Sequence, residues 1–184
     1  IAIGTLAADA LTTGGCTIAM GLNALGAATI GEANIAIGQS AMAGVTTGQA
    51  DNNIAIGVSA LVGAAGTTGD NNIALGYNSG QGNSTSDHNI SLGYTAGDLT
   101  GPGNVAIGRG ALSGNNSGQY NVGIGYEAGN DVSTGNSNVL IGAYSGDFIT
   151  TSELIVAIGY QALSGATTEA DGNTAVGYQA MDGN

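Results

Sequence analysis

The stretch Asn34-Ile35-Ala36-Ile37-Gly38 decides the fold, because the chain repeats it with small changes along its whole length. Two further copies, at 53–57 and 72–76, read Asn-Ile-Ala-Ile-Gly and Asn-Ile-Ala-Leu-Gly. The glycine that ends each copy, here called the anchor glycine, recurs every 15 to 19 residues. A short, regular period of this kind is typical of a solenoid, in which successive coils stack on one another. The anchor glycines are Gly4, Gly21, Gly38, Gly57, Gly76, Gly93, Gly108, Gly125, Gly142, Gly159 and Gly177.

The residues before each anchor glycine have the chemistry of a β-strand. The position one before it is always apolar, the position three before it is always β-branched, and the position between them is alanine in eight of eleven coils. β-Branched side chains suit a pleated sheet, and the step is too short for a helical crossover. We therefore expect an all-β parallel β-solenoid of about eleven coils of ~17 residues. Its core strands carry Ile35, Ile37, Ile54, Ile56, Ile73, Leu75, Ile107, Ile124, Ile141 and Ile158.

Neither face of these strands carries charge. Alternation places the bulky aliphatic side chains on one face and Asn, Ala and Gly on the other. Only one face of a thin coil can point inward, so the other must meet another chain or layer, which indicates an oligomer. The pattern leaves open which face points inward. We expect aliphatic side chains of successive coils to superpose and share an interior, and glycines further along to form corners around a second, short strand.

A column of asparagines lies four positions before the anchor glycine. Thr17 and Ile155 interrupt it. Stacked in register, these amides can hydrogen-bond along the stack as a structural ladder, and asparagine also tolerates left-handed corners. The column consists of Asn34, Asn53, Asn72, Asn89, Asn104, Asn121, Asn138 and Asn173.

Composition excludes several classes of partner. Thirteen acidic residues face a single basic one, Arg109, for a net charge of −12. Phosphate binding needs Lys and Arg, so we expect no nucleic-acid partner. No apolar run is long enough to span a bilayer, so we expect no membrane insertion by this segment. The chain opens and closes within the repeat, and we interpret 1–184 as one repetitive segment of a longer fibre protein.

The repeated Asn-[Ile/Val]-Ala-[Ile/Leu]-Gly-x-x-Ala string resembles the YadA-like head repeat of trimeric autotransporter adhesins. The variant Asn-Thr-Ala-Val-Gly-Tyr-Gln-Ala at 173–180 is similar to repeats of phage and large-virus tail fibres. The resemblance covers essentially the whole chain and implies a left-handed β-roll, a homotrimer and an extracellular setting on a virion tail fibre or a bacterial surface. It implies an adhesive or receptor-facing role, with the receptor unknown. The coils here are longer than the family repeat, and no stalk, neck or anchor barrel is present in the sequence.

Few residues offer reactive chemistry. The single histidine, His88, follows Asp87 in a loop, and adjacent residues rarely form the base and orienter of a triad, so we expect no enzyme. The loops Asp51-Asn52, 69–71 and Asn130-Asp131 could offer oxygens to Ca²⁺, although ordinary turn chemistry explains them better. We expect no other cofactor.

Tyrosine follows the anchor glycine in five coils and could form a surface stripe. The rings could stack on one another, and they could also contact a glycan or protein partner. The five are Tyr77, Tyr94, Tyr126, Tyr160 and Tyr178.

The function expected from these features is that of a rigid shaft or head in a trimeric extracellular fibre. An ice- or mineral-binding solenoid is an alternative, because threonine pairs recur at 12–13, 46–47, 67–68 and 167–168. A glycan-degrading tail spike is a further alternative. It needs paired carboxylates, whereas Glu32, Glu127, Glu153 and Glu169 are scattered among coils.

Overall fold

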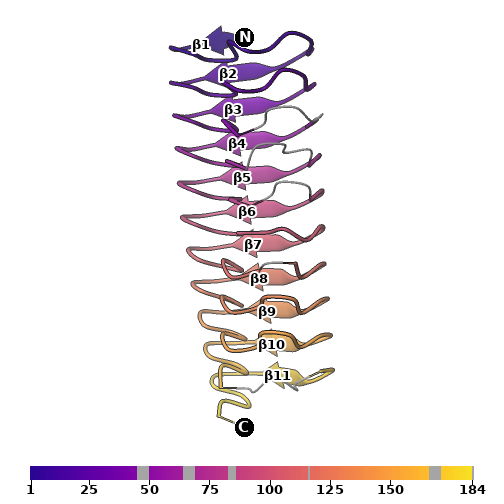
Figure 1. The fold of residues 1–184 in the computed structure, drawn as a ribbon. Coiled ribbons are helices and arrows are strands. Elements are labelled where there is room, and N and C mark those ends of the chain that lie inside the picture. Colours follow the sequence, from indigo (N-terminus) through magenta and orange to yellow (C-terminus); the bar gives the residue numbers. More distant parts are fainter. Residues whose placement is uncertain (45–49, 64–68, 83–85, 116, 166–170, 184) are drawn as a thin grey trace.

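Eleven short parallel strands, one in each coil, join into a single sheet that runs the length of a rod (Figure 1). The computed structural model describes residues 1–44, 50–63, 69–82, 86–115, 117–165 and 171–183. Strand order follows chain order throughout, and the two termini lie at opposite ends of the rod. No helix is present in these ranges. The strands are β1 (Ala2–Ile3), β2 (Ile18–Met20), β3 (Ile35–Ile37), β4 (Ile54–Ile56), β5 (Ile73–Leu75), β6 (Ile90–Leu92), β7 (Val105–Ile107), β8 (Val122–Ile124), β9 (Val139–Ile141), β10 (Val156–Ile158) and β11 (Thr174–Val176).

The register stacks equivalent residues of successive coils. Ile37 pairs with Ile56, and Ile56 with Leu75, so the aliphatic side chains superpose along one axis as the repeat predicts. Each strand from β2 to β10 hydrogen-bonds to the coil before and the coil after it, and the bonding continues past the anchor glycine. The chain is therefore an all-β parallel β-solenoid with coils of about 17 residues.

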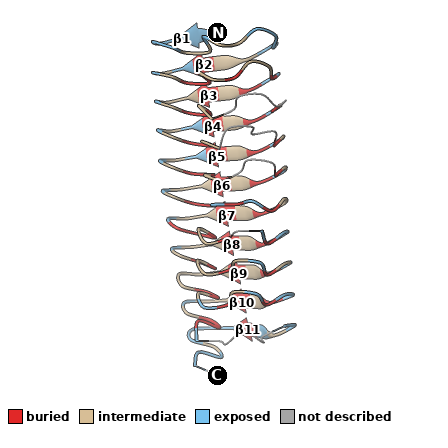
Figure 2. Cartoon of the chain, in the orientation of Figure 1, coloured by how far each residue is buried: buried red, intermediate tan, exposed pale blue. Residues whose placement is uncertain are grey.

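The small side chains, not the large ones, point into the coil. The middle residue of each strand from β2 to β11 is buried, whereas the aliphatic residues on either side of it are half-buried or exposed. Figure 2 shows the buried positions recurring at the same place in each coil. The ten aliphatic strand residues named above, from Ile35 to Ile158, lie on the strands as expected. Their side chains form the outer face of the chain instead of the shared interior, which corrects that expectation.

The interior is narrow because larger side chains enter it from the opposite wall. These come from the fourth position after the anchor glycine, as at Leu25, Met42, Leu61, Leu112 and Leu163, all of which are buried. Alanine on the strand leaves them room, and alanine or serine three positions after the anchor glycine is also buried in the coils from Gly21 to Gly159. Large side chains from one wall thus meet small side chains from the other, which gives the dense packing of a protein core.

The second, shorter strand expected in each coil is not formed in the described residues, where only an isolated bridge joins Thr13 to Ile30. Left-handed turns take its place. Met42 and Leu61 adopt φ values of 53° and 52°, and the equivalent residues of the other coils behave alike. In this left-handed region non-glycine residues carry backbone strain, and the conformation persists only where the surrounding structure holds the backbone. Here the amides of these two residues donate to Ala60 and Ser79 of the next coil.

Candidate functional site

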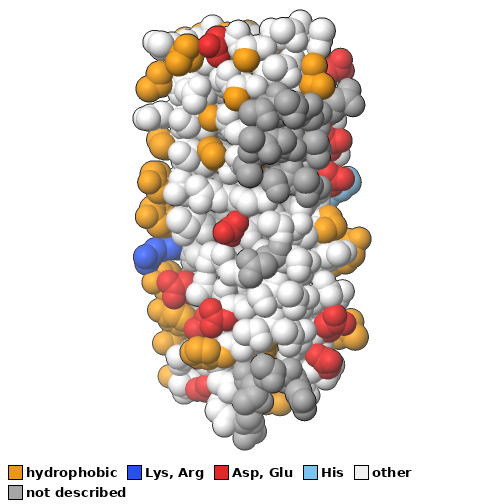
Figure 3. All heavy atoms as spheres, in the orientation of Figure 1, with side chains coloured by type: hydrophobic (Ala, Val, Ile, Leu, Met, Phe, Trp, Pro, Cys, Tyr) orange, Lys and Arg blue, Asp and Glu red, His pale blue; other side chains and the backbone are white. Residues whose placement is uncertain are grey.

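The outer face of the sheet forms a continuous strip along the length of the rod. It consists of the residues three before, one before and one after each anchor glycine, and we call it the strand face. Figure 3 shows hydrophobic side chains along the left edge of the rod, with the single basic side chain among them. An exposed apolar surface of this extent marks an interaction site in most proteins. Its exposed large members are Ile1, Ile3, Met20, Leu22, Ile56, Val58, Leu75, Tyr77, Tyr94, Tyr126, Tyr160, Val176 and Tyr178.

Aromatic side chains form a ladder along one margin of the strand face. Tyr77 stacks on Tyr94 with ring centroids 5.3 Å apart, and Tyr160 stacks on Tyr178 at 5.5 Å. Tyr144 joins Tyr126 to Tyr160 through edge contacts at 5.2 and 6.1 Å. We call this series, with Arg109, the tyrosine ladder. Tyr144 was not predicted, because it stands two positions after Gly142 and not directly after it. The small Ala143 in the usual tyrosine position was the one sign that the next residue takes its place.

Arg109 fills the gap in the middle of the ladder. Its guanidinium carbon lies 5.8 Å from the ring centroid of Tyr94 and 5.2 Å from that of Tyr126, and one guanidinium nitrogen donates to the Tyr126 hydroxyl at 2.8 Å. These are cation–π distances. Within the described ranges Arg109 makes no ion pair, so aromatic rings are its partners in the chain.

The stacking geometry bears on what the ladder can bind. Sugars pack on the open face of an aromatic ring, and the stacked pairs Tyr77–Tyr94 and Tyr160–Tyr178 cover each other's faces, with interplanar angles of 11°. In each of these four rings one face is therefore covered by its stacking partner, and Tyr178, in the last coil, remains 73% exposed. The surface contact predicted for Tyr77, Tyr94, Tyr126, Tyr160 and Tyr178 stays a prediction.

The asparagine column forms hydrogen bonds inside the coil. In the seven asparagines from Asn34 to Asn138 the amide oxygen accepts from the backbone N–H of the next coil, as in Asn72 N–H to Asn53 at 2.8 Å. In six of these seven the amide nitrogen donates to a turn carbonyl, as from Asn53 to Gly69 at 3.0 Å. The exception is Asn89, whose amide nitrogen has no partner among the described residues. The bonds therefore run from side chain to backbone and not from amide to amide. The seven asparagines from Asn34 to Asn138 are at most 2% exposed, whereas Asn173 is half-buried.

The acidic loops use their carboxylates in a similar way. Asp51, Asp70 and Asp87 each accept, at 2.8 Å, the backbone N–H of the equivalent residue in the preceding coil. This is ordinary Asp turn chemistry repeated by stacking. In the part of the chain that the structure describes, no three His, Cys, Asp or Glu residues gather closely enough to hold a metal ion. The threonine pairs 46–47, 67–68 and 167–168 lie outside the described residues.

One carboxyl group has a strongly perturbed pKa. Burial, reinforced by the charges of Asp131 and Glu127, raises the pKa of Asp147 to about 6. The folded state therefore favours the protonated acid, and the stability gained from proton uptake is complete below pH 3.8 and lost as the pH rises through about 6. At neutral pH the ionised Asp147 destabilises the coil.

Replacing Asp147 with asparagine should raise the melting temperature at pH 7.5 and change it little at pH 4. The amide keeps the size of the side chain and removes the charge that burial disfavours. Thermal melts followed by circular dichroism at the two pH values measure the difference. Asp9→Asn is the control, since Asp9 stands at the equivalent position of the first coil and is exposed. Equal gains for both variants, or a gain at pH 4 as large as at pH 7.5, would contradict the assignment.

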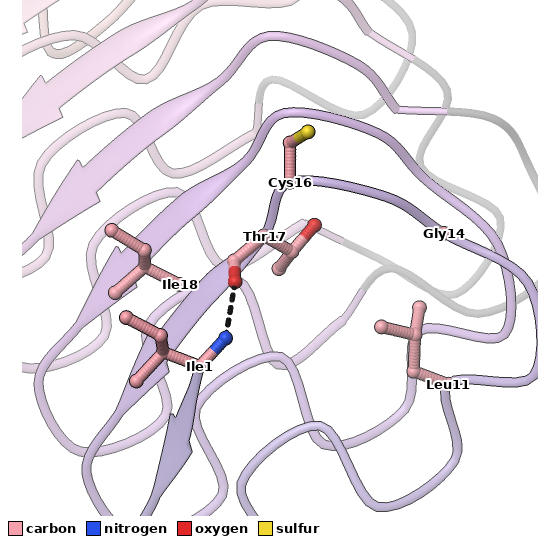
Figure 4. Close-up of a pocket in the computed structure, with 6 residues that line it drawn as sticks. All are labelled: Ile1, Leu11, Gly14, Cys16, Thr17 and Ile18. Carbon is pink, nitrogen blue, oxygen red and sulfur yellow. Dashed lines mark hydrogen bonds between the residues drawn. The ribbon is translucent and has the colours of Figure 1, made fainter.

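A hollow of about 380 Å³ opens at the N-terminal end of the rod (Figure 4). Leu11, Gly14, Cys16 and Ile18 help to line it, and the Ile1 amino group donates to the Thr17 carbonyl at 2.7 Å beside it. It is the interior of the first coil seen from its open end. The side chains among its lining residues are uncharged.

These features define the chain as a parallel β-solenoid with a largely apolar strand face and an internal asparagine ladder. Comparisons with models of protein families, with curated proteins and with solved structures found no match. In the described ranges there is no helix of the length and hydrophobicity that a bilayer crossing requires.

Proposed function

We propose that this chain is a structural and adhesive segment of a trimeric extracellular fibre. The observation that carries the proposal is the strand face, which is largely apolar from the first coil to the last. Its polar members include Thr5, Gln39 and Thr174, and its only charged side chain is Arg109. Water contact along this surface is unfavourable at ~25 cal/mol per Å² of apolar area, so burial against a partner stabilises it.

The period of the strand face favours further copies of the same chain as the partner. Its rows repeat once per coil, at ~4.8 Å, over about 50 Å. Only a surface with the same rise can keep contact through eleven coils, and an identical chain has that rise. A strip of this length and about 15 Å width offers on the order of 750 Å² per chain, close to the ~800 Å² that one partner buries in a stable interface. In a trimer this area is divided between two neighbouring chains. Rotational symmetry about the rod axis keeps equivalent coils at equal height, and the resemblance to YadA-like head repeats indicates three chains.

The mechanism of such a segment is geometric. A continuous backbone ladder resists bending and proteolysis, so the rod holds a binding tip at a distance from its anchor. Three chains also repeat each surface feature three times, and weak contacts of the exposed loops then add through multivalency. The fibre belongs, on this proposal, to a virion tail or a bacterial surface, and its receptor is unassigned.

The mass of the assembly tests the proposal. Native mass spectrometry or light scattering should give three times the 17.6 kDa chain. Ile56→Glu and Ile107→Glu should dissociate the trimer, because they place a charge on the strand face, and circular dichroism should show that each coil stays folded, since both side chains already contact solvent.

Leu154→Glu is the matched control. Leu154 is 64% exposed but lies five positions before its anchor glycine and therefore off the strand face. It should leave the trimer intact. A wild-type chain that remains monomeric at micromolar concentration would overturn the proposal, as would dissociation of the trimer by Leu154→Glu but not by Ile56→Glu.

A further inference from the structure

The interior of the rod is interrupted between β5 and β6. Buried apolar residues form two separate clusters, one ending at Leu61 and Ala74 and the other beginning at Ala96 and Leu99. The residues from 76 to 89 include no Leu, Ile, Val, Met or Phe. Four positions after the anchor glycine this coil has Gly80, preceded by the buried Ser79. The coils of Gly93, Gly125 and Gly142 also have glycine there, but each of them buries a large apolar side chain further along, and these are Leu99, Val132 and Ile149.

Two buried polar atoms lie at the same place without a hydrogen-bond partner among the described residues. They are the Asn89 amide nitrogen and the Ser91 hydroxyl, both on residues with no exposed surface. Asn89 directly precedes β6 and Ser91 is the middle residue of β6, so the two lie two positions apart in extended backbone and both side chains enter the interior. A buried polar group without a partner costs ~1–3 kcal/mol.

The length of the next coil explains the missing partner of Asn89. In other coils the asparagine nitrogen donates to a turn carbonyl of the following coil, as from Asn72 to Ser86. The coil from Gly93 to Gly108 has 15 residues, the shortest spacing in the chain. Its turn carbonyl, at Gly101, accepts from Asn104 at 2.8 Å instead.

The contacts that remain across this junction are on the backbone and on the outside. Gly93 N–H donates to Leu75 at 2.8 Å and Thr95 N–H to Tyr77 at 2.9 Å. The Tyr77–Tyr94 stack closes the same junction on the strand face. The junction is thus held by its ladder and its outer surface, with little apolar burial between the two coils.

We propose that the junction between β5 and β6 is a joint in the rod. Away from the two ends, it is the place where neighbouring coils separate first. In a solenoid, stability is a sum of coil terms and nearest-neighbour interface terms, so the weakest interface separates first. The joint divides the rod into two cooperative blocks, the coils of β1–β5 and those of β6–β11. Each block holds one of the two apolar clusters.

Hydrogen–deuterium exchange followed by mass spectrometry of peptic peptides tests the joint. Gly93 and Thr95, which donate across it, should exchange about ten-fold faster or more than the equivalent donors at two other junctions. Those are Gly57 and Ser59, which donate to β3's coil, and Gly142 and Tyr144, which donate to β8's coil. Fraying from the ends would give the opposite order, because the proposed joint lies in the middle of the rod.

Two substitutions test whether the unpaired hydroxyl and the missing apolar side chain cause the fast exchange at the joint. Ser91→Ala removes the hydroxyl that has no partner and restores the alanine found at this position in eight coils. Gly80→Leu adds the large apolar side chain that six other coils have at this position, and the φ of Gly80, 65°, is close to the 52° of Leu61. Each should slow exchange at the joint by about ten-fold and leave the other junctions unchanged. Exchange at the joint no faster than at the two reference junctions would overturn the proposal. So would fast exchange that neither substitution slows. Neither outcome bears on the trimer.

Discussion

Replacing Gly57 with alanine should destabilise the solenoid by about 4 kcal/mol or more and lower its melting temperature by roughly 10 °C or more. Gly57 has a φ of 137°, a conformation that L-residues rarely adopt. A Cβ built on it would lie 2.4 Å from the Gly76 carbonyl oxygen of the next coil. That oxygen belongs to backbone held in the ladder, so it cannot move aside without breaking the stack.

The last anchor glycine separates the cost of backbone strain from the cost of the clash with the next coil. Gly177 has a similar φ of 131°, but the nearest atom to a Cβ there is the Ala180 methyl carbon at 3.9 Å. Gly177→Ala should therefore show the cost of backbone strain alone, well under half of the effect at Gly57. Gly15→Ala should be neutral, since nothing lies within 4 Å of its Cβ and its φ is ordinary. Thermal and urea melts of the three variants measure this order, and equal melting of Gly57→Ala and Gly177→Ala would show that coil-to-coil contact is not the constraint.

The solenoid was predictable because its stacking leaves a direct mark on the sequence. An anchor glycine is required wherever its neighbour in the next coil approaches too closely for a side chain, so the glycine column reports the stacking itself. The β-branched and apolar positions before it report the strand. The same columns set the register, and the pairing of Ile37 with Ile56 and Leu75 follows from aligning the glycines.

The direction of the strand faces could not be predicted, because neither face is charged. In most sheets a polar face marks the solvent side, and here the outward side chains are the larger and more apolar ones. The clue lay elsewhere in the coil. Leucine or methionine four positions after the anchor glycine fills the interior from the opposite wall, and only alanine on the strand fits against it. That the leucine or methionine packs against the strand alanine is visible only in the folded coil, because the two positions lie on opposite walls of it.

The residues of the candidate site could also be predicted only in part from the sequence. Position relative to the anchor glycine predicts the tyrosine ladder, except where Tyr144 joins it from the adjacent position by an edge contact. The asparagine column was predictable as a ladder, but its partners are backbone groups, since those are what a buried amide finds inside a coil. The short spacing at Gly93 was visible in the sequence, yet its consequence for Asn89 depends on which carbonyl comes within reach.

Replacing Asn121 with alanine should cost about 2–5 kcal/mol, because it leaves two buried backbone groups without partners. The Asn121 amide oxygen accepts from Asn138 N–H at 2.9 Å, and its nitrogen donates to the Gly135 carbonyl at 2.8 Å. Asn89→Ala should cost about half as much, because that side chain makes only the bond from Asn104 N–H, at 2.8 Å, within the described residues.

Asn173→Ala completes the series at the end of the rod. Asn173 is half-buried, and its backbone carbonyl, which accepts from Val156 at 2.9 Å, survives the substitution, so the expected cost is within about 0.5 kcal/mol. The natural Ile155 shows how a coil close to that end tolerates the change. Its N–H still donates to Asn138 at 2.9 Å, while its side chain joins the apolar core. Urea unfolding monitored by circular dichroism should therefore rank the losses as Asn121, then Asn89, then Asn173. Equal losses at Asn121 and Asn89 would mean that the amide nitrogen contributes nothing, and the ladder would then act through its oxygens alone.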